Sequence, residues 1–311
     1  MQPTVDGVYA ALLTPRNGDG SLNREVLRAE AEFLIGTGVD GVVMNGATAE
    51  YPLGRECEFA EIAAIVGEVA GIGRFLAGIG GADVAGSIRN AEVAMAAGAR
   101  ALLLPAPMFF RYGQEDVEAY ARHIASKVEA PILLYNLPQF ANGYQPETAL
   151  RLIQAVGPIK GIKDSSGSLD ILRLLTERGA EGISRIVGND QVFAQARREG
   201  VCDGVVSGVA GAVPELLVFL ARADFASDGA SFDAAATLLA ELIEHLNVFP
   251  TPWGLKFIAE SRGIGAMGSA LPVAESRLAQ AELLAAWLEE WWVRLRATVP
   301  AGPLMVEDCV V

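Results

Sequence analysis

The sequence predicts an α/β protein, a (β/α)₈ barrel of the TIM-barrel type with a C-terminal helical extension. Three observations lead to this prediction. Strongly apolar segments of strand length recur eight times in roughly the first 210 residues, helix-like segments separate them, and the strand signals stop near residue 225. The chain has 311 residues, 51% of them hydrophobic and 20% charged, so it can build a large apolar core.

The predicted strands are mostly near-continuous apolar runs rather than alternating patterns. Strands that are covered on both faces, as in a parallel sheet flanked by helices, have this composition. In chain order they are residues 7–15, 41–48, 74–80, 101–107, 131–136, 159–166, 184–190 and 202–210.

The segments between the strands have the periodicity of amphipathic helices. Residues 23–38, for example, place apolar side chains at Val26, Leu27, Phe33 and Leu34 and end on glycine. Eight strand–helix units favour a closed barrel. A doubly wound open sheet is the alternative, but its first strand is usually followed by a G-x-G-x-x-G turn, and LLTPRNGDG is not one.

The chain is predicted to divide into three parts. Residues 1–225 form the barrel that carries the active site, residues 226–298 form a helical region packed on it, and residues 299–311 form a flexible tail.

A stripe of tryptophans stands out in the last predicted helix. Trp287, Trp291 and Trp292 are spaced, together with several leucines, as on one side of a helix. We expect this stripe to be core or a packing face against the barrel, and a subunit contact is the alternative.

Composition excludes several classes of partner. The formal net charge of −14 disfavours nucleic acid and anionic membrane surfaces. The three cysteines and two histidines are scattered, which argues against a disulfide framework and against a metal site. No apolar run reaches the roughly 18 residues that span a bilayer, and the N-terminus lacks the features of a signal peptide. We therefore expect a cytoplasmic protein.

Two of only four lysines lie in the segment KGIKDSSG, in a chain that contains twenty arginines. Lysine can lose its proton and become a nucleophile, whereas arginine remains charged. Strand alternation is expected to place Ile159, Gly161 and Lys163 on one face, and Lys160 and Ile162 on the other.

An inward-facing Lys163 would have a lowered pKa, because apolar surroundings disfavour the ammonium. A neutral amine can attack a ketone and form an imine. An ion pair between Lys163 and Asp164, or another carboxylate, is the alternative, and the segment alone does not decide between them.

Polar residues also close other predicted strands. Tyr135 could transfer protons during imine formation, or could simply be an anchored interior tyrosine. The small-residue segment NGATAE around Thr48 could offer backbone N–H groups to a carboxylate, or could be a tight turn. Asp190 and Gln191 could bind substrate hydroxyls, or could cap the helix that follows.

Four motifs together carry a family resemblance. NGATAE, YNLP, GIKDSSG and GVVSGVA, in this order and spacing, resemble the dihydrodipicolinate synthase / N-acetylneuraminate lyase family over essentially the whole chain. The resemblance implies a (β/α)₈ barrel of the class I aldolase type, assembled as a homotetramer (a dimer of dimers). It also implies catalysis without a metal or other cofactor, through a covalent imine.

The resemblance implies specific roles for matched residues. Lys163 would form the imine with pyruvate or another 2-oxo acid, and Tyr135 would be the proton shuttle. Thr48 and the N–H groups of Ala47 and Thr48 would hold the carboxylate of the 2-oxo acid. Further substrate-binding positions would be Gly46, Phe140, Ser165, Gly188, Asp190, Gln191 and, through its backbone carbonyl, Val206.

The chain departs from the family pattern at three positions. Ala47 replaces the Thr or Ser of the proton relay, and Pro107 stands where a neighbouring subunit usually contributes a tyrosine. Phe140 replaces the arginine that binds the second substrate's carboxylate in dihydrodipicolinate synthases, and an aromatic ring cannot make that charge-assisted pair. We expect Phe109, Phe110 and Phe140 to form apolar walls of the distal pocket.

The resulting prediction is a Schiff-base lyase or aldolase that releases or uses pyruvate together with an aldehyde partner. The expected substrate is a 2-keto-3-deoxy sugar acid or a related hydroxy-2-oxo acid. The alternatives are dihydrodipicolinate synthase activity, dehydration of a 2-oxo sugar acid, and non-catalytic binding of a 2-oxo acid.

Overall fold

A closed barrel of eight parallel strands forms the centre of the computed structural model, which describes residues 4–179, 181–225 and 227–299. Strand β1 pairs with both β2 and β8, which closes the sheet. The strands are β1 (Gly7–Ala11), β2 (Gly41–Met44), β3 (Phe75–Gly78), β4 (Ala101–Pro105), β5 (Ile132–Asn136), β6 (Ile159–Asp164), β7 (Ser184–Val187) and β8 (Gly204–Ser207). The predicted fold class is therefore confirmed, with strands shorter than the apolar runs that predicted them.

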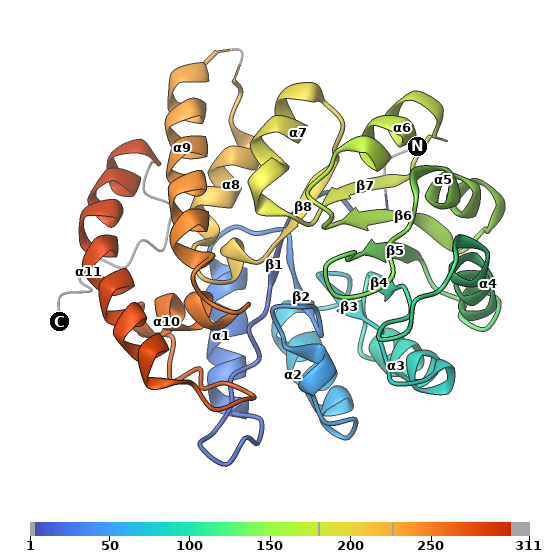
Figure 1. Ribbon diagram of the computed structural model, residues 1–311, viewed down its shortest axis with the longest axis horizontal. Coiled ribbons are helices and arrows are strands. Elements are labelled where there is room, and N and C mark those ends of the chain that lie inside the picture. The colour runs from blue at the N-terminus through green and yellow to red at the C-terminus, as the bar shows by residue number, and fades with distance from the viewer. Residues whose placement is uncertain (1–3, 180, 226, 300–311) are drawn as a thin grey trace.

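A helix follows each strand and packs on the outside of the barrel (Figure 1). These helices are α1 (Arg24–Gly36), α2 (Glu58–Ala70), α3 (Val84–Ala96), α4 (Gln114–Ala125), α5 (Pro146–Ala155), α6 (Asp170–Arg178), α7 (Phe193–Glu199) and α8 (Pro214–Arg222). Short 3₁₀ turns η1 (Tyr51–Leu53), η2 (Asp190–Val192) and η3 (Val209–Gly211) lie in the connections after β2, β7 and β8.

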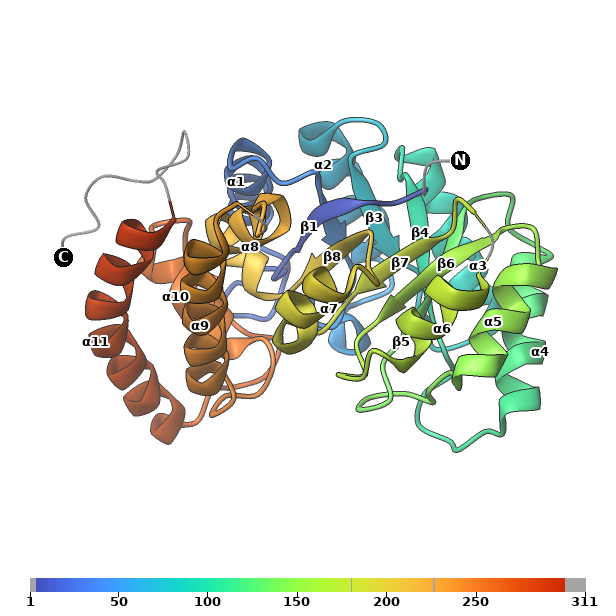
Figure 2. The same cartoon turned by 90° about the horizontal axis from the view of Figure 1, so that it is seen from above.

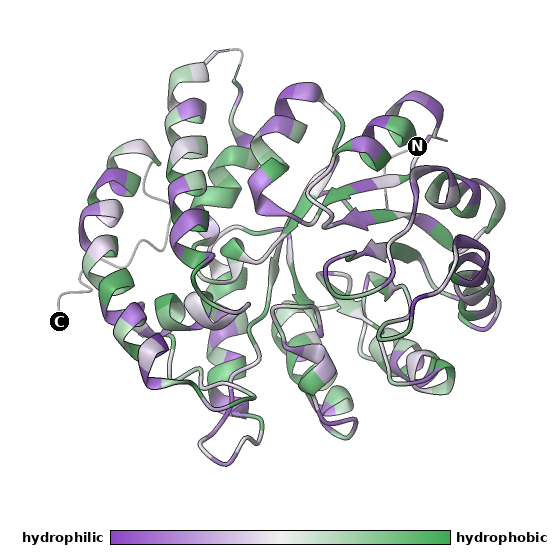
Figure 3. Cartoon of the chain, viewed as in Figure 1, coloured by the Kyte–Doolittle hydropathy of each residue, from purple (hydrophilic) through white to green (hydrophobic). Residues whose placement is uncertain are grey.

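Two apolar layers hold the barrel together. The larger lies between the strands and the helices, and the smaller fills the inside of the barrel. The inner layer consists of Val5, Tyr9, Ala11, Val43, Leu76, Ala101, Leu103, Leu133, Tyr135, Leu137, Ile186 and Val206. Because both faces of the strands are buried, the strands are mostly hydrophobic, whereas hydrophilic residues gather on the surrounding helices (Figure 3).

An irregularity in β6 overturns one detail of the predicted face assignment. Ile132 pairs with Ile159 and Leu133 with Gly161, so Lys160 is the extra residue of a bulge. Ile159 consequently packs in the outer layer, and not on the inner face with Lys163. Gly161 suits this position, because its φ is +152° and a Cβ there would lie 2.1 Å from the carbonyl oxygen of Ser184.

Three further helices form a layer beside the barrel (Figure 2), where α9 packs against α8. They are α9 (Gly229–Leu246), α10 (Trp253–Ser261) and α11 (Glu275–Thr298). The Trp291 indole is buried and donates a hydrogen bond of 3.1 Å to the carbonyl of Leu238 on α9. Trp287 stacks on His245, also on α9, with ring centroids 3.7 Å apart.

The tryptophan stripe is therefore a packing face, as predicted, but its contacts are with α9 of the helical extension and not with the barrel. No helix in the described part of the chain is long and apolar enough to cross a membrane. The predicted flexible tail lies outside the described residues from position 300 onward.

Candidate active site

A cavity of about 380 Å³ opens among the carboxyl ends of the strands. Nine of the eleven residues predicted to act in the site line it, although they come from five separate stretches of the sequence. They are Ala47, Thr48, Tyr135, Phe140, Lys163, Ser165, Gly188, Asp190 and Val206. The other two, Gly46 and Gln191, are not among the lining residues, and Gln191 is exposed.

Lys163 lies at the centre of this cavity wall with only 4% of its surface exposed. Burial lowers the pKa of its amine from 10.5 to about 7, and the nearby carboxylate of Asp190 opposes that shift only in part. Among the described residues Lys163 forms no ion pair within 4.0 Å. Asp164 instead accepts hydrogen bonds from the Asn136 amide (2.8 Å) and from the backbone N–H of Ser166 (2.9 Å).

Gly188 provides the space that the lysine occupies. A Cβ at this position would lie 2.1 Å from the Ser165 hydroxyl oxygen and 2.8 Å from Cε of Lys163. Any other residue would therefore displace the lysine side chain or the serine. The sequence marks this glycine by its place directly after the seventh predicted strand and by the family resemblance.

Tyr135 is the register partner of Lys163 on β5, and its ring centroid lies 4.0 Å from the lysine Nζ. The phenol is buried, and burial raises its pKa well above the ordinary value of 10. The backbone N–H of Ala47 and the hydroxyl of Ser165 act in the opposite direction, but their effect is smaller. Tyr135 is thus a neutral phenol near pH 7, able to donate a proton and to take one back.

The segment 45–50 after β2 forms a tight turn between two residues in the left-handed region. Asn45 has φ +55° and Glu50 φ +53°, an uncommon conformation for residues other than glycine. The Asn45 amide donates to the carbonyl of Gly78 (2.7 Å), and the Thr48 hydroxyl donates to the carbonyl of Leu12 (3.2 Å). The backbone N–H of Thr48 has no acceptor among the described residues, so it can bind an oxyanion.

Asp190 faces Lys163 from the turn after β7. One carboxylate oxygen accepts from the backbone N–H of Val209 (3.1 Å), and the other is buried with no hydrogen-bond partner among residues 4–179, 181–225 and 227–299. Burial raises the pKa of this carboxyl group, more than its hydrogen bonds lower it. The capping role that the sequence left open belongs to Asn189, whose side chain accepts from the N–H of Gln191 (3.0 Å).

The far wall of the cavity comes from the helical extension, which the sequence did not indicate. It consists of Ile243, Leu246, Asn247, Phe249, Pro250, Thr251, Pro252, Gly254 and Leu255, around the turn between α9 and α10. Among the described side chains that line the cavity, only Lys163 and Asp190 carry an ionisable amine or carboxylate.

The predicted aromatic wall is only partly correct. Phe140 lines the cavity with 62% of its surface exposed. Phe109 and Phe110 do not line it, and they are 92% and 64% exposed. The reason is that Asn142 binds the backbone of this loop at Phe110 (2.8 Å) and Tyr112 (3.0 Å), which leaves the two rings on the surface.

Comparison with known proteins agrees with this geometry. The model of the dihydrodipicolinate synthetase family matches residues 4–290. The chain belongs to this family. Like other members of the dihydrodipicolinate synthetase family, it is an enzyme of the class I aldolase and lyase type, which confirms the resemblance predicted from the motifs.

Individual members of the dihydrodipicolinate synthetase family match over most of their length. The 4-hydroxy-tetrahydrodipicolinate synthase of Azoarcus sp. (strain BH72) is 32% identical over 273 residues, which cover 86% of this chain and 92% of the relative. The solved 4-hydroxy-tetrahydrodipicolinate synthase of Methylacidiphilum fumariolicum SolV superposes with a TM-score of 0.85 at 25% identity, over 95% and 99% of the two chains. YagE, a prophage protein from E. coli K12 solved in complex with pyruvate, gives 0.81 at 25% identity, over 91% and 98%.

Proposed function

We propose that this enzyme forms an imine between Lys163 and the C2 carbonyl of a 2-oxo acid, and breaks or makes the C3–C4 bond of that acid. The observation that carries the proposal is the buried amine of Lys163, with its pKa near 7, 4.0 Å from the ring of Tyr135. Such an amine is partly neutral at pH 7, as nucleophilic attack requires. The pyruvate bound to a family member, YagE, supports a 2-oxo acid as the ligand.

The cleavage reaction would run through five steps. The amine attacks C2, and the resulting carbinolamine loses water after Tyr135 passes a proton to the departing hydroxyl group. The Tyr135 phenolate then takes the proton of the C4 hydroxyl, the C3–C4 bond breaks, and the aldehyde leaves while the bonding electrons move into the protonated imine. The enamine takes up a proton at C3, and water hydrolyses the new imine to release pyruvate and free Lys163.

The near side of the cavity would hold the carboxylate of the 2-oxo acid. The backbone N–H groups of Ala47 and Thr48 lie beside Tyr135 in the turn after β2. Two adjacent backbone N–H groups bind anions well, and the attraction is stronger in a buried site than in water because the local dielectric constant is lower. Ala47 lacks a relay hydroxyl, so we propose that Tyr135, with its neighbour Ser165, moves the protons.

The far side of the cavity favours a hydroxylated, uncharged aldehyde half, as in a 2-keto-3-deoxy sugar acid or a related hydroxy-2-oxo acid. Ser165, Asp190 and Thr251 offer hydrogen bonds to hydroxyl groups, and Phe140 and Phe249 offer apolar contact. Dehydration of such an acid on the same imine is a second outcome of this geometry.

Dihydrodipicolinate synthase activity is the second candidate function, because the similar relatives carry that name. The second substrate of that activity would place its carboxylate in the far half of the cavity. No cationic side chain from the described part of the chain lines that half, and Phe140 stands where the resemblance expects an arginine. We also propose, from the family resemblance, a homotetramer arranged as a dimer of dimers, which sedimentation analysis would test.

Trapping with borohydride tests the proposal. The enzyme is incubated with pyruvate, reduced, and digested for mass spectrometry. We expect a reduced pyruvyl group on Lys163, its loss in Lys163→Ala, and its retention in the matched control Lys160→Ala, which alters an exposed lysine of the same strand. Absence of an adduct with every 2-oxo acid tried would favour a protein that only binds such acids.

A further inference from the structure

A second lysine, Lys256 on α10, is as deeply buried as the catalytic candidate but has a different environment. Only 2% of its surface is exposed. Its three ammonium hydrogens match three acceptors: the Glu50 carboxylate at 2.6 Å, the carbonyl of Gly268 at 2.8 Å and the carbonyl of Thr14 at 3.2 Å. With all donors paired, this ammonium is a structural cation rather than a nucleophile.

The three acceptors come from segments that are far apart in the sequence. Thr14 follows β1, Glu50 ends the turn after β2, and Gly268 lies between α10 and α11. Thr14 and Glu50 both occupy the left-handed region, with φ of +47° and +53°. Such conformations persist only where the surroundings hold them, so Lys256 stabilises two strained positions at once.

Glu50 closely follows the proposed carboxylate-binding turn, and Thr14 belongs to the segment after β1 that this turn contacts. Thr48 lies two residues before Glu50, and its hydroxyl donates to the carbonyl of Leu12, two residues before Thr14. Lys256 therefore ties together the two segments whose contact fixes the position of Thr48. The extension that forms the far wall of the cavity thus also contacts, through Lys256, the residue that ends the turn after β2.

We infer that Lys256 is a positioning residue that holds the turn 46–48 in the conformation that presents the Ala47 and Thr48 N–H groups to the carboxylate of a 2-oxo acid. The inference rests on the proposed function of that turn. Loss of the clamp lets the turn relax away from its left-handed end at Glu50, which weakens capture of the carboxylate. The amine of Lys163 keeps its own surroundings and reacts normally once the 2-oxo acid is bound.

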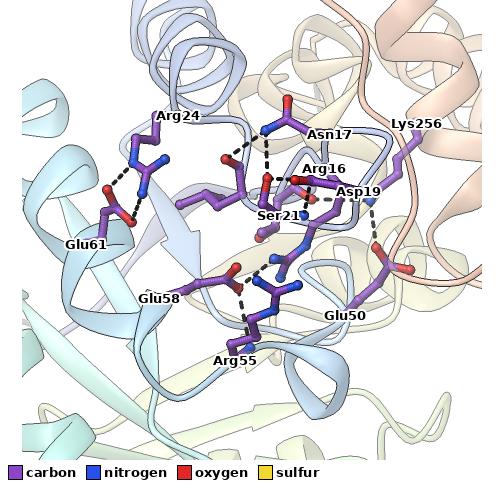
Figure 4. Close-up of polar contacts among 12 residues, drawn as sticks. Arg16, Asn17, Asp19, Ser21, Arg24, Glu50, Arg55, Glu58, Glu61 and Lys256 are labelled. Carbon is purple, nitrogen blue, oxygen red and sulfur yellow. Dashed lines mark hydrogen bonds and ion pairs between the residues drawn. The ribbon is translucent and has the colours of Figure 1, made fainter.

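A neighbouring ion pair provides a matched control (Figure 4). Arg16 and Glu58 are also buried and lie 2.5 Å apart. Figure 4 shows the two pairs side by side, with Lys256 reaching Glu50 and Arg16 reaching Glu58. Neither Arg16 nor Glu58 is hydrogen-bonded to residues 46–50 in the described structure, so breaking this pair leaves a buried charge but removes no hydrogen bond of the turn.

The test compares Lys256→Met, the double variant Lys256→Met/Glu50→Gln, and Arg16→Met by borohydride trapping at temperatures where each is folded. We expect the pyruvate concentration for half-maximal trapping to rise on the order of tenfold in both Lys256 variants, with the maximal trapping rate kept within about threefold. Arg16→Met should unfold at a lower temperature and keep the wild-type half-maximal concentration.

The double variant separates positioning from stability, because it removes the lysine without leaving an unpaired carboxylate. If it regains the wild-type half-maximal concentration along with thermal stability, the ion pair serves stability alone and the inference is overturned. An unchanged half-maximal concentration in Lys256→Met overturns it as well.

Hydrogen exchange of the peptide that contains residues 45–50 measures the opening of the turn independently of imine formation. Exchange should be faster in both Lys256 variants and unchanged in Arg16→Met. Unaltered exchange in Lys256→Met overturns the inference that Lys256 holds the turn. Absence of an adduct in the wild-type enzyme instead overturns the proposed function. The two failures are therefore distinguishable.

Discussion

The Nζ atom of Lys163 lies 4.0 Å from the ring centroid of Tyr135, because the two residues are register partners on β6 and β5. Their proximity is thus built into the pairing of two central strands and does not depend on a flexible loop. Rigid strands hold reacting groups more closely in place than loops do, which suits the proton transfers that imine formation requires.

The pH dependence of trapping should report the lowered pKa of Lys163. Below about pH 7 the amine is protonated and cannot attack, so the trapping rate at saturating pyruvate should rise with pH and level off above a midpoint near 7. The measurement is the initial rate of adduct formation across the pH range. A midpoint close to the ordinary lysine pKa of 10.5 would show that burial does not lower the pKa of this amine.

Removal of the Tyr135 hydroxyl should slow the chemistry while keeping the packing. Tyr135→Phe retains the ring beside Lys163, and we expect imine formation to slow by about a hundredfold or more. Tyr144→Phe is the control, since this buried hydroxyl has no hydrogen-bond partner in the described structure and does not line the cavity. Equal trapping rates for Tyr135→Phe and the wild type would exclude Tyr135 as the proton shuttle.

A cation at position 140 should change which substrates are accepted. Phe140 lines the cavity, and Phe140→Arg would supply the guanidinium that the far half lacks. We expect kcat/KM for a substrate with a second carboxylate to rise about tenfold relative to one with an uncharged aldehyde half. Phe110→Arg, an exposed position outside the cavity, should leave the ratio unchanged. An unaltered ratio in Phe140→Arg would mean that this residue does not select substrates.

Glu30 on α1 should make the protein less stable as the pH rises. Burial raises its pKa from 4.5 to about 8, although it accepts a hydrogen bond from the N–H of Leu13. The folded state therefore keeps a proton that the unfolded state loses above pH 4.5, and the associated stability disappears as the pH approaches 8.

Glu30→Gln removes this titration and keeps the acceptor. The free energy of unfolding of the variant, minus that of the wild type, should increase with pH by up to about 1.4 kcal/mol per unit between the two pKa values. Denaturant titrations at several pH values provide the measurement. A difference that does not change with pH would contradict the assignment of a protonated Glu30.

The sequence was a good guide where a feature depends on nearest neighbours along a strand. The burial of both faces of the strands predicted the barrel, and alternation predicted that Lys163 and Ile162 lie on opposite faces of their strand, as they do. Alternation failed one step further back, because the bulge at Lys160 follows from pairing with β5. The one local signal in β6 is Gly161, because a glycine inside a strand often marks a bulge.

Contacts that join distant segments could not be predicted from the pattern. The far wall from α9 and α10 begins at Ile243, 80 residues after Lys163, and the clamp joins Lys256 to Glu50, 206 residues apart. The exposure of Phe109 and Phe110 depends in the same way on Asn142, more than thirty residues further along the chain. Sequence periodicity indicates which face of an element is buried. It does not indicate which distant residues meet once the barrel has closed.

The site of covalent attachment tests the central claim most directly. After reduction with borohydride in the presence of pyruvate, peptide mapping by mass spectrometry should place one reduced pyruvyl group on Lys163 and leave Lys160 and Lys256 unmodified. An adduct at any lysine other than Lys163, or turnover that persists in Lys163→Ala, would contradict the account.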